Sequence, residues 1–126
     1  MADSEEECGD PMLVDRPLTE EERSLALWML ENGKPEASAF IPQLEKARVF
    51  RLCGCGCASV DFKIEGHPEP AGGLHILGDY IFGDNDAPGG AFIFEQDGLL
   101  SGIEVLLYDG HDACRVLPKP SELRSF

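Results

Sequence analysis

The stretch AFIFEQDGLLSGIEVLLY, residues 91–108, carries the strongest fold signal in the chain. Residues 91–96 and 99–108 are rich in β-branched and aromatic side chains, and the pair Asp97-Gly98 separates them. An Asp-Gly pair favours a tight turn whose twist matches that of the two strands it joins. This stretch therefore predicts an antiparallel hairpin with its turn at Asp97-Gly98.

Further strands are predicted on both sides of this hairpin. Residues 49–52 form a short apolar run, and residues 60–65 alternate between apolar and charged side chains, which is typical of a strand with one wet face. Residues 74–82 predict another strand, with Gly78 as a possible bulge. A last short strand is expected at residues 115–117.

Two helices are predicted before the strands. Thr19 and Glu22 stand three residues apart and form a capping-box pattern, and apolar side chains then recur at helical spacing. We therefore expect a helix over residues 19–32. Residues 36–47 predict a second, shorter helix, which Pro42 either kinks or starts afresh.

Helices followed by strands indicate an α+β fold. We expect two N-terminal helices packed on one face of a mostly antiparallel sheet of about five or six strands. Residues 1–17 are predicted to be an acidic, loosely ordered arm, and residues 18–126 a single α+β domain. Trp28 and the phenylalanines have core-facing spacing and are assigned to the core.

The charge of the chain limits the partners it can have. The chain has 126 residues and a net charge of −14, from 24 acidic and 10 basic residues. Such a surface repels phosphate backbones and anionic lipids, so we expect neither nucleic-acid nor membrane binding. The acidity either serves solubility or forms a surface for a basic protein partner. The polar, acidic start of the chain lacks a signal-peptide pattern, so a cytoplasmic location is expected, and the oligomeric state stays open.

The most unusual motif is Cys53-Gly-Cys55-Gly-Cys57. In an unbroken strand the three thiols would share one face with Arg51, an arrangement suited to a soft metal such as zinc or to redox chemistry. His111-Asp-Ala-Cys114 has the spacing of a further ligand pair.

A structural explanation of the motif competes with the chemical one. Zinc ligands usually stand two to four residues apart, so neighbouring C-x-C thiols wrap one ion poorly. The glycines can instead make a turn or bulge between two strands, which leaves the cysteines as small, half-buried apolar residues. We therefore expect no cofactor, with zinc at Cys53, Cys55 and Cys57 as the alternative.

No other motif indicates catalysis. Asp84, Asp86 and Glu95 stand at calcium-loop positions, but Pro88 replaces a ligand and a hairpin loop explains these residues better. Nucleophile and nucleotide motifs are missing from the sequence. The expected function is a non-enzymatic interaction or regulatory module of the immunity type. The alternative is a metal-binding or thiol-redox protein.

Residues 47–62, ARVFRLCGCGCASVDF, resemble a family of small bacterial proteins that carry an R-x-C-x-C-G-C motif and have no assigned function. The strand at residues 100–105 and the run at residues 117–120 extend this resemblance over residues 19–123. The resemblance implies a bacterial, cytosolic protein and no particular activity.

Overall fold

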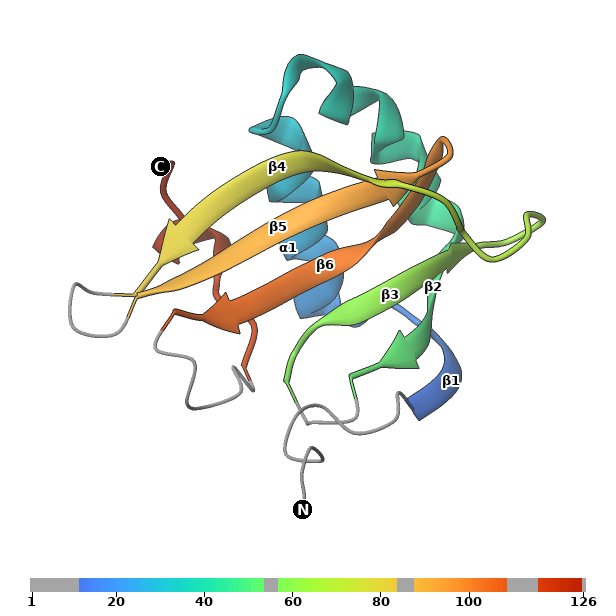
Figure 1. The fold of residues 1–126 in the computed structure, drawn as a ribbon, viewed down its shortest axis with the longest axis horizontal. Helices are drawn as coiled ribbons and strands as arrows, with labels where there is room; N and C mark the ends of the chain where they lie inside the picture. The colour runs from blue at the N-terminus through green and yellow to red at the C-terminus, as the bar shows by residue number, and fades with distance from the viewer. Residues whose placement is uncertain (1–11, 54–56, 84–87, 109–115, 126) are drawn as a thin grey trace.

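A computed structural model describes residues 12–53, 57–83, 88–108 and 116–125. The described chain contains an antiparallel sheet of six strands in the order β1-β2-β3-β6-β5-β4 (Figure 1). The strands are β1 (Met12–Pro17), β2 (Ala47–Leu52), β3 (Val60–Ile64), β4 (Leu74–Phe82), β5 (Gly89–Gln96) and β6 (Leu99–Leu107). The helical segments are α1 (Glu20–Glu31) and the two 3-10 segments η1 (Pro35–Lys46) and η2 (Pro120–Glu122).

The predicted hairpin around Asp97-Gly98 is confirmed. Strands β5 and β6 pair from Gln96 opposite Leu99 to Gly89 opposite Leu107. Asp97 and Gly98 both have positive φ angles, 55° and 85°, as the tight turn requires. The strand predicted at residues 74–82 is β4, and its register shifts next to Gly78, where a bulge was expected.

The predicted capping box of the first helix is also present. Thr19 Oγ1 accepts a hydrogen bond from the Glu22 backbone N–H at 3.1 Å, and the Glu22 carboxylate accepts one from the Thr19 N–H at 2.9 Å. The helix ends at Asn32, whose side chain and backbone both donate to the Trp28 carbonyl.

The predicted position of the helices at the N-terminus is wrong. Residues 12–17, which were expected in the arm, form strand β1, so α1 and η1 lie between β1 and β2. β1 pairs with β2 from Met12 opposite Leu52 to Pro17 opposite Arg48. This pairing is a non-local contact. The sequence of residues 12–17 does not alternate between apolar and polar side chains, so the sequence did not predict this strand.

The second predicted helix is present as the 3-10 segment η1, and Pro42 lies within it. The predicted last strand needs correction. Val116 and Leu117 do not form the expected last strand, whereas Arg115 lies outside the described residues. The chain instead continues through η2 and returns to β4 at an isolated bridge between Ile81 and Arg124.

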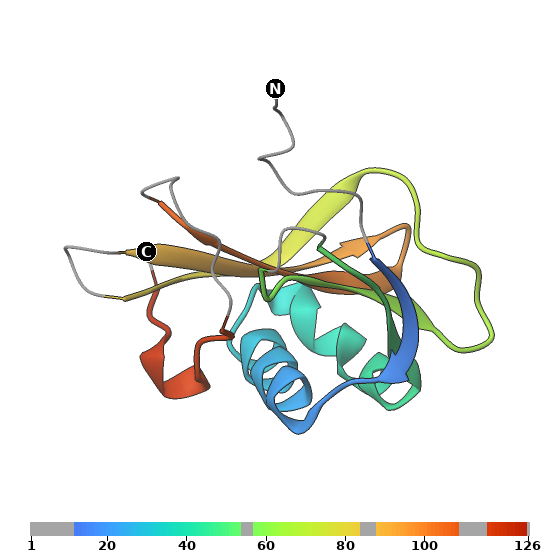
Figure 2. The same ribbon diagram turned by 90° about the horizontal axis from the view of Figure 1, so that it is seen from below.

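All three helical segments cover the same face of the sheet (Figure 2). The core between the two layers includes Leu25 and Met29 of α1 against Phe62 and Ile93 of the sheet. The Tyr80 hydroxyl ties the layers together by donating to the Met29 carbonyl at 2.9 Å. Among the described residues, no helical segment covers the other face of the sheet (Figure 2). No helix in the described ranges is long and apolar enough to cross a membrane.

Candidate functional site

The face of the sheet that no helix covers is a continuous surface, here called the helix-free face. Its side chains alternate along each strand with those that enter the core. Asp61, for example, stands between Val60 and Phe62, both of which belong to the core cluster. Register places one residue from every strand in a row across this face: Leu13, Arg51, Asp61, Gly102, Phe94 and Ile76.

A second, shorter row crosses β4, β5 and β6, two residues along β5 and β6 from the first row. Phe92 of β5 is paired with Asp79 of β4 on one side and with Glu104 of β6 on the other. Cross-strand neighbours on one face lie about 5 Å apart between their Cβ atoms. Asp79 and Glu104 are therefore the cross-strand neighbours of Phe92 on this face.

Two phenylalanines that the sequence assigned to the core lie instead on the helix-free face. Phe92 and Phe94 alternate with Ala91 and Ile93, which are fully buried in the core. The two rings lie 5.8 Å apart between centroids. All four residues are apolar, so their sequence does not reveal which pair faces the core.

Gly102 allows the Phe94 ring to lie flat on the sheet. A Cβ atom at Gly102 would stand 3.0 Å from Phe94 Cζ and 2.5 Å from the Val60 carbonyl oxygen. Phe94 fills that space and is only 6% exposed. Phe94 is therefore packed against β6 at Gly102.

The carboxyl groups of the helix-free face are held in an environment that disfavours their charge. Burial raises the pKa of Asp61, although Arg51 opposes the shift with an ion pair at 3.3 Å. Burial also raises the pKa of Glu104, and the neighbouring Asp61 carboxylate raises it further. The pKa of Asp79 is raised by burial as well. A cation supplied by a partner would relieve this unfavourable environment.

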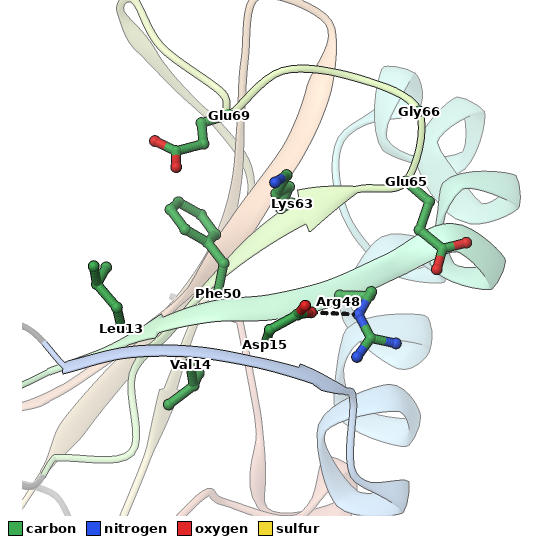
Figure 3. Close-up of a pocket in the computed structure, with 9 residues that line it drawn as sticks. All are labelled: Leu13, Val14, Asp15, Arg48, Phe50, Lys63, Glu65, Gly66 and Glu69. Carbon is green, nitrogen blue, oxygen red and sulfur yellow. Dashed lines mark hydrogen bonds and ion pairs between the residues drawn. The ribbon is translucent and has the colours of Figure 1, made fainter.

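A groove of about 570 Å³ lies at the β1 end of the same face (Figure 3). Its apolar wall includes Leu13 and Phe50, and Glu69 lies on its far side. At the rim of the groove, Asp15 forms an ion pair with Arg48, with 2.6 Å between Asp15 Oδ1 and Arg48 Nε. The groove therefore combines an apolar wall with a charged rim.

Cys53 and Cys57 lie in a different place, at the end of the hairpin formed by β2 and β3. β2 ends at Leu52 and β3 begins opposite it at Val60, so residues 51–63 are not one continuous strand. The unbroken strand that would give the three thiols one shared face is therefore not formed. Cys53 and Cys57 are half-buried and line a second groove, of about 540 Å³. Cys55 lies outside the described residues.

The remaining candidate ligands do not gather around these thiols. No group of three histidine, cysteine or acidic side chains among the described residues could hold a metal ion. His75 lies between Glu95, at 2.8 Å, and Glu36, at 3.1 Å. Glu95, a candidate calcium ligand, also accepts from the Gly98 N–H. The other candidates, Asp84, Asp86, His111 and Cys114, lie outside the described residues.

Comparison with known proteins adds no family to this geometry. No protein-family model matches the chain, and searches of curated proteins and of solved structures found no match. The resemblance to bacterial proteins with an R-x-C-x-C-G-C motif therefore stays a prediction.

Proposed function

We propose that this protein is a non-enzymatic interaction module that binds a basic protein partner on its helix-free face. The row Asp79–Phe92–Glu104 carries the proposal. An aromatic ring between two carboxyl groups suits the side chain of arginine or lysine, because the ring attracts the cation and the carboxylates accept its hydrogen bonds. Such a module fits the regulatory or immunity type, in which binding masks a basic surface of the partner.

Long-range charge supports the same kind of partner. The net charge of −14 steers a basic protein towards the chain and speeds its association. The segments 1–11, 84–87 and 109–115 adjoin Met12, Phe82, Gly89 and Leu107 or their close neighbours, which all lie at one end of the sheet. By sequence these segments contain nine acidic residues and one arginine.

A charge-reversal pair tests this proposal directly. The probe is the peptide acetyl-Arg-Gly-Arg-Gly-Arg-amide, titrated into isotopically labelled protein and followed by amide chemical shifts. In the double variant Asp79→Lys/Glu104→Lys we expect at least a tenfold loss of affinity. The matched control is Glu31→Lys/Glu45→Lys, which makes the same change in net charge at exposed helical positions. The control should lose affinity only slightly.

The same titration has a result that would overturn the proposal. If both double variants bind the peptide equally weakly, net charge alone explains binding and the helix-free face has no special role. We expect wild-type binding to weaken as salt rises, because exposed charge pairs are screened. Cys53→Ser and Cys57→Ser should leave binding unchanged.

A second candidate function rests on the two thiols that share one groove. Cys53 and Cys57 both line the groove of about 540 Å³ at the end of the β2–β3 hairpin. Two thiols in one groove favour a metal-binding or thiol-redox protein over isolated cysteines. Elemental analysis of gently purified protein, with thiol counting under anaerobic conditions, tests this function. Absence of bound metal together with ordinary alkylation rates would exclude it.

A further inference from the structure

We propose that the outer edge of β1 accepts an extended segment of the basic partner as an additional strand. The inference rests on the proposed function and adds to it the place and the mode of binding. In this mode, main-chain hydrogen bonds supply affinity, and alternate side chains of the added segment supply specificity.

The two edges of the sheet differ in how they are protected. At the β4 edge, the Lys34 N–H donates to the Leu77 carbonyl at 2.8 Å. Further along the same edge, Ile81 and Arg124 exchange two backbone hydrogen bonds, of 2.9 and 3.0 Å. β1, the other edge strand, pairs with β2 on its inner side, and no described residue makes a backbone hydrogen bond to its outer side. An unprotected edge is a template for another strand.

The side chains of β1 do little to prevent such pairing. Met12 and Leu13 are 56% and 77% exposed, which is unusual for apolar residues at a free edge. The two charges of β1 are already paired, Asp15 with Arg48 and Arg16 with Glu22. Free charges are one of the features that guard natural sheet edges, and the side chains of β1 provide none.

The groove beside β1 supplies the side-chain contacts that a short strand needs. β1 has six residues, ends at Pro17 and shifts register between Leu13 and Arg16, so its main chain alone offers few hydrogen bonds. An added strand would place alternate side chains next to Leu13 and Asp15, and longer ones would extend over the groove. An apolar chain can cover Leu13 and Phe50 there.

Charge in the groove favours a basic segment. Asp15 neutralises Arg48. The remaining charged side chains that line the groove are those of Lys63, Glu65 and Glu69. None of these last three side chains has an ion-pair partner within the described part of the chain. Two free carboxylates against one ammonium give the groove a negative balance. A second copy of the chain would instead bring another net charge of −14 to this edge.

The test uses two peptides with the same side chains. The first is acetyl-Val-Lys-Val-Lys-Val-Lys-Val-amide, and the second is its analogue methylated at alternate backbone nitrogens, which removes donors without changing charge. We expect the first peptide to slow hydrogen exchange at those amides of residues 13–16 that point away from β2, and to leave β4 amides unaffected. The methylated analogue should bind at least tenfold more weakly, because it cannot complete the strand ladder.

Two leucine variants locate the effect. Leu13→Ser should weaken binding of the unmethylated peptide several-fold. The control is Leu74→Ser, the same substitution at an exposed position of the other edge strand, and it should not weaken binding. If the two peptides bound equally well and changed the amide chemical shifts of Phe92 and Glu104 alone, the edge inference would be overturned. The proposed function would still stand. Failure of every basic peptide to bind would overturn both. A dimer of peptide-free protein that buries β1 would identify a second copy as the occupant and overturn the inference.

Discussion

Arg16 of β1 and Glu22 of α1 form a two-pronged ion pair, with 2.9 Å from Nη1 to Oε1 and 2.9 Å from Nη2 to Oε2. The same Oε1 atom accepts the Thr19 backbone N–H of the capping box. Glu22 is only 5% exposed. A single carboxylate therefore caps the helix and fixes the edge strand to the helix start.

Neutralising Glu22 should destabilise the fold. Glu22→Gln keeps an oxygen for the Thr19 N–H but leaves the partly exposed Arg16 guanidinium without its counter-charge. We expect the free energy of unfolding to fall by about 1–3 kcal/mol, between the values typical of exposed and of buried ion pairs. Urea unfolding measures it. Glu21→Gln, an exposed change in the same helical turn, is the control, and an equal loss in both variants would contradict the expectation.

Acid should remove the same stabilisation. Burial alone would raise the pKa of Glu22, but hydrogen bonds from Arg16 and Thr19 outweigh it and hold the pKa below its ordinary value of 4.5. A carboxyl with a lowered folded pKa stabilises the fold above its unfolded pKa, and this stability is lost as pH falls through the folded pKa. Between pH 5 and lower pH, unfolding free energies should therefore fall more steeply for the wild type than for Glu22→Gln. Parallel curves would show that Glu22 is not the titrating group.

Glu104 should behave in the opposite way. Burial and the Asp61 carboxylate raise its pKa, so the folded protein holds the proton more tightly than the unfolded chain does. Stability from this group is complete below the unfolded pKa and is lost as pH rises through the folded pKa. Glu104→Gln should thus be more stable than the wild type at pH 7, by less than about 1 kcal/mol because solvent partly screens the group. The difference should vanish at low pH.

The control for this titration is Glu45→Gln, at an exposed position of η1. It should change the free energy of unfolding little at either pH. A Glu104→Gln variant that is less stable than the wild type at pH 7 would mean that the carboxylate makes a favourable contact in the folded protein, and the expectation would be wrong.

The elements that the sequence predicted correctly depend on residues close together in the chain. The strand that it did not predict depends on a contact between distant residues. The hairpin at Asp97-Gly98 and the capping box at Thr19 each depend on residues close in sequence, so both could be predicted. Strand β1 depends on pairing with β2, whose partner residues stand 31 to 40 positions away in the sequence, as between Leu13 and Arg51. The sequence of residues 12–17 alone does not indicate that β2 is their partner.

The candidate site was hidden for a related reason. Phe92 and Phe94 alternate with Ala91 and Ile93, and a strand that is apolar on both faces gives no period-two signal. Glu104, between Ile103 and Val105, did mark the helix-free face in the sequence, but its neighbour Phe92 is known only from the register of β5 and β6. Cys53 and Cys57, in contrast, line the groove at the end of the β2–β3 hairpin.

The contact between Gly102 and Phe94 gives a last test of how the helix-free face is built. In Gly102→Ala the new methyl group would stand 2.5 Å from the Val60 carbonyl oxygen and 3.0 Å from the Phe94 ring, so β3 and β6 must separate or the ring must move. We expect a loss of about 2 kcal/mol or more in unfolding free energy, typical of overpacking against backbone. Urea unfolding measures it, and amide shifts at Phe94 and Asp61 should change. Gly73→Ala, where the added methyl group meets nothing within 4 Å, should be nearly neutral. If Gly102→Ala proved equally neutral, Phe94 would not be packed on β6 and the face would be looser than its register implies.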